Sequence, residues 1–178
     1  IKALKNTLPI PGQKHDVELT YITSRGQWYQ YSWKGDLDKS GGIATNIGIH
    51  FFDMLSYLFG PVVKASVHGR EATRSYGFLD LEHARVKWFL SIDENDLPKE
   101  VREKGERTYR SIQIDGNDID FTQGFTSLHE LSYREILDGR GVGLQDARPS
   151  IEIVSAMREL DPNCGEGDVH PFGQKNVG

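Results

Sequence analysis

One segment, from Ile43 to Phe59, limits more than any other what this chain can fold into. It contains no proline, and Gly60-Pro61 follows it, the kind of sequence that stops a helix. Its apolar positions are Ile43, Ile47, Phe51, Met54, Leu55, Leu58 and Phe59. A predicted helix that is apolar around most of its circumference must be covered by neighbouring elements, so it is expected to be a largely buried helix.

One narrow stripe of this predicted helix is polar. Asn46, His50, Asp53 and Tyr57 follow each other at intervals of four, three and four residues. At about 100° per residue, they lie within roughly 60° of arc. Two interpretations remain open. The stripe is either a solvent-facing strip, although such strips usually carry the Lys and Glu that this helix lacks, or it lines a cleft, where a histidine suits acid–base chemistry near neutral pH.

The remaining pattern predicts an α+β fold with a mainly antiparallel sheet, because the strands cluster and do not alternate strictly with helices. The predicted strands are 16–24, 62–71, 78–81, 84–91, 108–115 and 119–121, with 28–33 as a further candidate. Helices are expected at 127–137 and from an N-cap at Asp146 to Leu160. The charged segment 93–106 is expected to be exposed, and the Gly- and Pro-rich tail from Asp161 to be mobile.

Composition excludes several classes of protein. A chain of 178 residues fits one domain or at most two small ones. Its net charge of -5 argues against a general binder of nucleic acid or of anionic membranes, so we expect neither partner. The single cysteine, Cys164, allows no intrachain disulfide and fits a cytoplasmic location. The sequence contains no long apolar run and no Gly-rich phosphate-binding motif.

The segment Gly41–Asp53, GGIATNIGIHFFD, resembles the GG-x3-D-x-G-x-H-x2-D signature of the Gfo/Idh/MocA oxidoreductases. Two further segments narrow the resemblance, SWKGD at 32–36 and GRGVGLQDARPSI at 139–151. Together they look like the branch of this family that oxidises UDP-N-acetylglucosaminuronic acid at C3 of the sugar, in the synthesis of bacterial surface polysaccharide (O-antigen and lipopolysaccharide). The resemblance spans nearly the whole chain.

The resemblance implies a two-domain parent protein. Residues 1–160 would form its C-terminal substrate-binding and oligomerisation domain, and residues 161–178 a tail. An N-terminal Rossmann domain, absent from this chain, would bind NAD(H). The implied fold is an open, mostly antiparallel sheet with helices packed on one face, similar to glyceraldehyde-3-phosphate dehydrogenase. The other sheet face would form subunit contacts in a homodimer or homotetramer, and this chain alone would be inactive because it lacks the nicotinamide site.

The resemblance also implies roles for particular residues. His50 would be catalytic and take the proton of the sugar 3-hydroxyl as hydride leaves C3 for the nicotinamide. Asn46 stands where the family more often has Asp; since an amide cannot ionise, it cannot stabilise an imidazolium as a carboxylate would, and we expect it to orient substrate. Lys34 would contact the carboxylate or diphosphate of the substrate, or be a solvated surface lysine. Weaker candidates for substrate binding are Arg25, Tyr29 and Thr45.

Three alternatives remain open. Although His50 and Asp53 are spaced like metal ligands, no third ligand lies nearby in sequence, so we expect no metal site. The aromatic run at 28–33 would stack a uracil ring or, as we favour, pack in the core or an interface. The third alternative concerns the function. Instead of oxidising a nucleotide sugar, the protein would act on inositol or another sugar, or it would be a non-catalytic, sheet-based oligomerisation module. If His50 and Asn46 are sealed beneath the sheet, the enzyme hypothesis loses support.

Overall fold

The computed structural model describes Leu8 and residues 12–119, 128–139, 141, 143–162 and 167–174. The strands are β1 (His15–Thr23), β2 (Val62–Arg70), β3 (Arg74–Leu81), β4 (Ala84–Ser91), β5 (Thr108–Ile114) and β6 (Asn117–Asp118). The helices are α2 (Gln27–Tyr31), α3 (Leu37–Ser40), η1 (Ala44–Gly48), α4 (Ile49–Phe59), η2 (Glu94–Asp96), α5 (Lys99–Glu103), α6 (Leu128–Leu137), α7 (Leu144–Glu159) and α8 (Pro171–Gln174).

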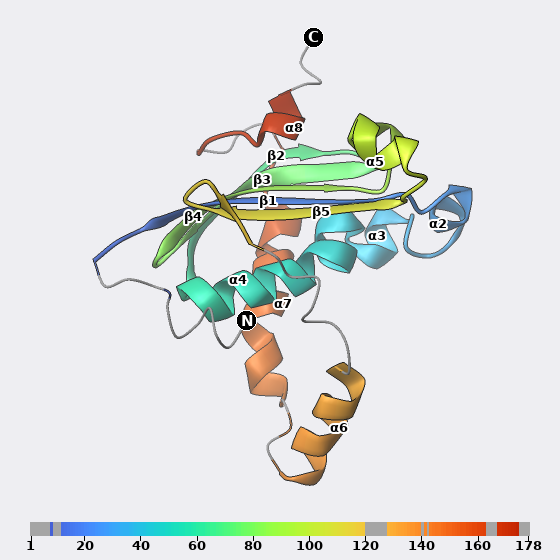
Figure 1. The fold of residues 1–178 in the computed structure, drawn as a ribbon. Coiled ribbons are helices and arrows are strands. Elements are labelled where there is room, and N and C mark those ends of the chain that lie inside the picture. The colour runs from blue at the N-terminus through green and yellow to red at the C-terminus, as the bar shows by residue number, and fades with distance from the viewer. Residues whose placement is uncertain are drawn as a thin grey trace.

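All six strands form one sheet in the order β2-β3-β4-β1-β5-β6 (Figure 1). β1 and β4 are parallel, and every other neighbouring pair is antiparallel. The prediction of an α+β fold with a mostly antiparallel sheet is therefore confirmed. β1 lies inside the sheet, between β4 and β5, although it is the first described strand along the chain.

The long helices α4 and α7 pack on one face of the sheet, as the resemblance implied (Figure 1). The core between them and the sheet includes the fully buried Trp88 of β4 and Phe52 of α4, whose rings meet edge to face with centroids 5.3 Å apart. Burial of large aromatic side chains of this kind supplies much of the stability of a domain of this size. The predicted helix over 43–59 thus anchors the fold.

A smaller apolar cluster lies on the opposite face of the sheet. Ile22, Phe89 and Leu97 are buried there, with Phe172 of α8 packed against them. Residues 167–174 therefore pack on the sheet, whereas the sequence led us to expect a mobile tail. Leu97 belongs to this cluster and is buried, so the charged segment 93–106 is not wholly exposed as we expected.

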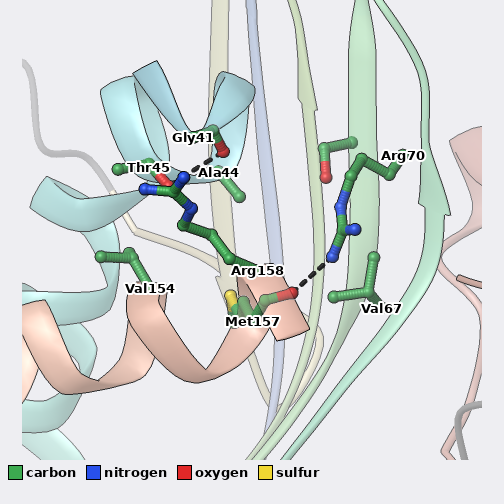
Figure 2. Close-up of a pocket in the computed structure, with 9 residues that line it drawn as sticks. Gly41, Ala44, Thr45, Val67, Arg70, Val154, Met157 and Arg158 are labelled. Carbon is green, nitrogen blue, oxygen red and sulfur yellow. Dashed lines mark hydrogen bonds between the residues drawn. The ribbon is translucent and has the colours of Figure 1, made fainter. Parts of the chain in front are cut away.

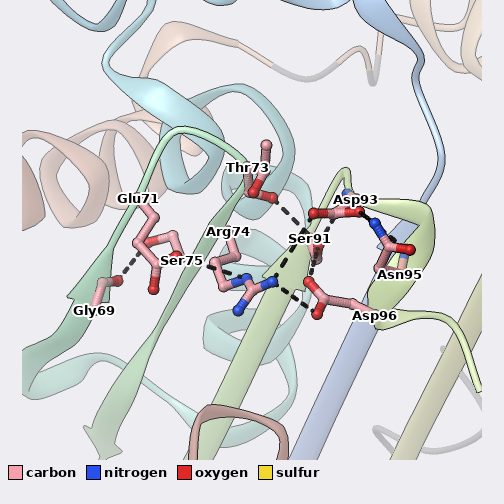
Figure 3. A network of polar contacts seen from close by, with 9 residues as sticks. All are labelled: Gly69, Glu71, Thr73, Arg74, Ser75, Ser91, Asp93, Asn95 and Asp96. Carbon is pink, nitrogen blue, oxygen red and sulfur yellow. Dashed lines mark hydrogen bonds and ion pairs between the residues drawn. The ribbon is translucent and has the colours of Figure 1, made fainter. Parts of the chain in front are cut away.

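A polar network fixes the loop that follows β4 (Figure 3). Arg74 at the start of β3 pairs with Asp96, with an N–O distance of 3.0 Å. Ser91 Oγ donates to the same carboxylate at 2.6 Å. The loop held in this way carries Ile92, whose carbonyl accepts from the backbone N–H of Arg25 at 3.4 Å. The network therefore supports the segment that leads into α2.

Three sequence predictions need correction. The candidate strand at 28–33 is wrong, because Gly26 adopts a positive φ of 68° and α2 follows. Since β1 already pairs on both sides, the residues after it have no free strand edge beside them. Asp146 is not an N-cap: α7 starts earlier, and Asp146 accepts the Gly143 N–H at 2.8 Å from inside the first turn. The strand predicted at 119–121 is displaced: the chain turns at Asp115 and Gly116, the next strand is Asn117–Asp118, and residues 120–121 lie outside the described residues.

Candidate functional site

The polar stripe begins in a short π-helical segment, η1, which runs directly into α4. Segments of π-helix are rare and are often found at functional sites. Gly41 and Gly42 precede it, with φ angles of 72° and 79° that other residues rarely adopt. The Asn46 side-chain amide donates to the Gly42 carbonyl at 3.2 Å, which ties the stripe to this glycine pair.

The stripe faces solvent. His50, Asp53 and Tyr57 are exposed, and Asn46 is half-buried. The side chains are therefore not sealed beneath the sheet, and of the two interpretations the solvent-facing strip is the one that fits, since no stripe residue lines the pockets of the described residues. Within the described part of the chain, no group hydrogen-bonds the His50 imidazole, so its ring is accessible to a ligand. Asp53 is likewise exposed and has no hydrogen-bond or ion-pair partner among the described residues.

Gly48 sets how closely this helix approaches the sheet. A Cβ atom at this position would lie 2.6 Å from the Phe52 ring and 2.9 Å from Leu90 of β4. Both distances are too short for real contacts, so a side chain here would force Phe52 and Leu90 to shift. This close approach fixes the position of His50, two residues further along the helix. The space beside Gly48 is thus filled by side chains of the core.

The other predicted substrate residues lie at one end of the sheet. Figure 1 places α2, α3 and the start of α4 together at the end where β1 terminates. Tyr29 is buried in the core cluster that also contains Ile43 and Ile47. Burial raises the pKa of the Tyr29 phenol, and the nearby Arg25 guanidinium acts against that rise. The Tyr29 hydroxyl and Arg25 Nε are both buried without a hydrogen-bond partner among the described residues.

The aromatic run divides in two. Tyr29 packs in the core, as we favoured, but Trp28, Tyr31 and Trp33 are 55%, 86% and 57% exposed. Lys34 is half-buried and places its Nζ 5.9 Å from the centroid of the Trp33 ring, within range of a cation–π contact. It is therefore neither a core residue nor a freely solvated one.

Thr45 lies apart from the other predicted substrate residues, at a pocket beside α7. Its Oγ1 donates to the Gly41 carbonyl at 3.0 Å, and its side chain borders a narrow pocket beside α7 that none of the stripe residues lines (Figure 2). Arg70 reaches across this pocket to the Met157 carbonyl and donates to the Leu160 carbonyl at 3.0 Å. A hollow of about 160 Å³ adjoins it, lined by Arg70 and Arg158 among others. Sequence reasoning missed both arginines, because no local pattern marks them.

Arg70 has a clear structural role at this pocket. The last carbonyls of a helix have no partner within the helix, and a cation there is favourable. Arg70 supplies that cation from β2 and thereby joins the end of α7 to the sheet. Arg158 extends the same contact by donating to the Asp38 carbonyl at 3.3 Å.

The described residues do not fit NAD. A dinucleotide pyrophosphate needs a Gly-rich turn between a strand and the N-terminus of a helix. Here β1 leads through the single Gly26 into the five-residue helix α2. Among the described residues no three His, Cys, Asp or Glu side chains are grouped to hold a metal ion. None of the described helices is long and apolar enough to cross a membrane.

Comparison with known proteins gives the stripe a context. Residues 12–77 match the family described as oxidoreductase family, C-terminal alpha/beta domain. The chain is 49% identical to the WlbA (WbpB) dehydrogenase from Thermus thermophilus solved with NAD and alpha-ketoglutarate, with a TM-score of 0.89. It is 47% identical to the same enzyme solved with NAD and UDP-GlcNAcA, with a TM-score of 0.87. Each match covers 96% of this chain, which spans 56% and 55% of those chains.

More distant structures show the same fold. The WlbA dehydrogenase from Bordetella pertussis is 17% identical, with a TM-score of 0.63, over 88% of this chain and 55% of that one. The matched family segment contains the glycine pair, the π-helical segment and the whole polar stripe. The chain belongs to the Gfo/Idh/MocA oxidoreductases and has the fold of their C-terminal alpha/beta domain.

Proposed function

We propose that this chain is the substrate-binding half of an NAD-dependent dehydrogenase that oxidises the 3-hydroxyl of UDP-N-acetylglucosaminuronic acid. The observation that carries the proposal is the 47% identity, over 96% of this chain, to a dehydrogenase solved with NAD and UDP-GlcNAcA. The exposure of His50 is compatible with it, because a substrate can reach the imidazole from outside the core.

His50 is the residue we assign to the chemistry. An imidazole exchanges protons near neutral pH and, when neutral, accepts the proton that a sugar hydroxyl loses on oxidation. The half-buried Asn46 lies one helical turn earlier. Its Nδ2 donates to the Gly42 carbonyl, so its amide oxygen remains as the atom that would accept from a substrate hydroxyl. Nicotinamide supplies the hydride acceptor when it is bound.

The cofactor would be held mainly by a dinucleotide-binding domain of the complete protein, since the described residues offer no pyrophosphate cradle. This chain alone would then lack dehydrogenase activity. We further propose a cytoplasmic enzyme of bacterial lipopolysaccharide synthesis that forms a homodimer or homotetramer through its sheet. These points rest on the resemblance to the branch described above.

The test is the kinetics of a His50→Gln variant of the complete protein. Loss of the proton acceptor is expected to lower kcat about 100-fold or more, because general acid–base groups contribute on that scale. The Kd for substrate, measured by calorimetry, is expected to change little. An unchanged kcat would remove His50 from the chemistry.

His83→Gln provides the matched control. His83 lies in the turn between β3 and β4, where its N–H donates to the carbonyl of Phe59 at the far end of α4. This variant is expected to keep both kcat and Kd. A comparable loss in both variants would indicate a general effect on folding rather than on chemistry.

A further inference from the structure

One backbone carbonyl at the end of α3 lacks its partner within the helix. In a continued α-helix, the carbonyl of Asp38 would accept from the N–H of Gly42, four residues later. That N–H donates instead to Oγ of the buried Ser40 at 3.0 Å, where the chain turns at Gly41 with a φ of 72°. The Asp38 carbonyl is therefore left for a donor from another part of the fold.

Arg158 of α7 supplies that donor. Its Nη2 donates to the Asp38 carbonyl at 3.3 Å, from 120 positions away in the sequence. Its aliphatic stem packs on the same turn, because a Cβ atom added to Gly41 would lie 3.1 Å from Arg158 Cδ. Among the described residues, the guanidinium has no other hydrogen-bond partner and no ion pair. Figure 2 shows Arg158 beside Gly41, at the turn that leads into η1.

The helix that carries Arg158 is itself well anchored. Val154 and Met157 of α7 are buried in the core, and Arg70 of β2 bonds the carbonyls of Met157 and Leu160 at the end of the helix. The Arg158 side chain is exposed, so its removal would leave no cavity in the core. Its contact with the turn can therefore be removed without disturbing the packing of the fold.

This turn carries the polar stripe. The carbonyl of Gly41 accepts from Thr45 Oγ1 at 3.0 Å, and the carbonyl of Gly42 accepts from Asn46 Nδ2 at 3.2 Å. The orientation of the Asn46 amide thus depends on where the glycine pair lies. Since His50 follows one helical turn later, a shift of the glycine pair changes the geometry between the amide and the imidazole.

We propose that Arg158 is a positioning residue of the candidate site. It acts without touching the substrate, because it fixes the glycine pair and thereby the geometry between Asn46 and His50. A misplacement of about 1 Å can cost roughly 100-fold in rate, so such a contact affects turnover more than substrate affinity. The inference rests on the proposed function and adds a residue from outside the segment 12–77 that matches the family.

Amide hydrogen exchange on the 178-residue chain tests the contact without relying on catalysis. Arg158→Met keeps an aliphatic stem and removes the donor, and it is expected to speed exchange in η1 about threefold or more, because local opening becomes easier. Arg148→Met is the matched control and is expected to exchange as the parent chain does. Arg148 is an exposed arginine on the same helix that pairs with Glu152 at 3.9 Å.

Kinetics of the complete protein test the consequence for the reaction. Arg158→Met is expected to lower kcat roughly tenfold, whereas the Kd for the nucleotide sugar and the midpoint of urea denaturation stay close to those of the parent protein. Arg158→Lys is expected to recover most of this loss, because an ammonium can donate to the same carbonyl. An equal loss in Arg158→Lys, or a loss of kcat accompanied by a lower urea midpoint, would overturn the proposal.

The outcomes separate this inference from the proposed function. If the complete protein does not oxidise UDP-N-acetylglucosaminuronic acid but exchange in η1 responds as expected, the function is wrong and the role of Arg158 at the glycine pair is supported. If the parent protein oxidises the sugar and Arg158→Met keeps both its kcat and its exchange in η1, the inference is overturned and the function stands.

Discussion

His170 shows how one side chain attaches the end of the chain to the sheet. Its imidazole is fully buried and stacks on Phe89, with ring centroids 5.6 Å apart. Nδ1 accepts the Phe172 N–H at 3.1 Å, so Nε2 carries the proton and donates to Thr20 Oγ1, also at 3.1 Å. Both ring nitrogens are therefore satisfied only while the imidazole is neutral.

Burial keeps it neutral. Loss of solvation, with a smaller contribution from the Lys87 ammonium, lowers the pKa of His170 to about 3 from an ordinary value of 6.5. The Glu18 carboxylate lies 3.9 Å from Nε2 but pairs with Lys87 at 3.3 Å, so it offsets little of this effect. Because the unfolded chain binds a proton that the folded chain excludes, stability falls as the pH drops below 6.5 and continues to fall toward about 3.

We predict that the free energy of unfolding depends more steeply on pH in the parent chain than in a His170→Gln variant. The difference is expected to reach up to about 1.4 kcal/mol for each pH unit below 6.5, the value for one linked proton. Urea denaturation of both chains at pH 7 and pH 5 measures it, and the variant accounts for all other titrating groups. Parallel pH dependences would mean that His170 is protonated in the folded chain.

The candidate site residues differ in how far the sequence predicts them. The spacing of His50 and Asn46 indicates one stripe, because helical periodicity is a local property. The burial of Tyr29 next to exposed neighbours has no such local signal, since it depends on contacts with the core. The role of Arg70 cannot be predicted for the same reason. Its hydrogen bonds reach carbonyls at the end of α7 that are 87 and 90 positions away in the sequence.

At the scale of elements, the approach of η1 and α4 to the sheet decides where the stripe lies. The contact depends on Gly48, which lies against Phe52 and Leu90. A longer side chain would push the helix away from β4 or force those two residues out of their positions. The position of the stripe is thus coupled to the packing of the core.

Gly48→Ala is therefore expected to lower the free energy of unfolding by about 1–3 kcal/mol, the usual cost of overpacking a core. Gly143→Ala is the matched control, because a Cβ atom there meets only Asp146 at an ordinary 3.6 Å. Urea denaturation of both variants measures the difference. Equal free energies of unfolding for the two variants would contradict the prediction, because they would show that a Cβ atom fits between the helix and the sheet.

The sequence predicts most elements of this fold but not all. The helix over 43–59 and the strands 62–71 and 84–91 follow from hydrophobic periodicity, which tertiary contacts reinforce here. The aromatic run at 28–33 resembles a strand in composition, yet no free strand edge is available to it and α2 forms. The π-helical geometry of η1 is also hidden, because no local pattern in Ala44–Gly48 distinguishes a π-helical turn from an α-helical one.

At the scale of the whole molecule, one sheet separates two environments. The long helices and the polar stripe belong to one face, and the segment 167–174 covers part of the other (Figure 1). The π-helical start of the stripe and α2 lie at the same end of the sheet, where β1 terminates (Figure 1). Tyr29 of α2 and Asn46 of η1, two of the predicted site residues, therefore belong to this end of the molecule.

The central claim is that this chain carries a formed site for a nucleotide sugar, and titration calorimetry of the 178-residue chain with UDP-N-acetylglucosaminuronic acid tests it most directly. We predict saturable binding that Asn46→Ala and Lys34→Ala weaken and that Lys64→Ala leaves unchanged. The absence of binding at millimolar ligand would contradict the claim, as would equal binding by all three variants and the parent chain.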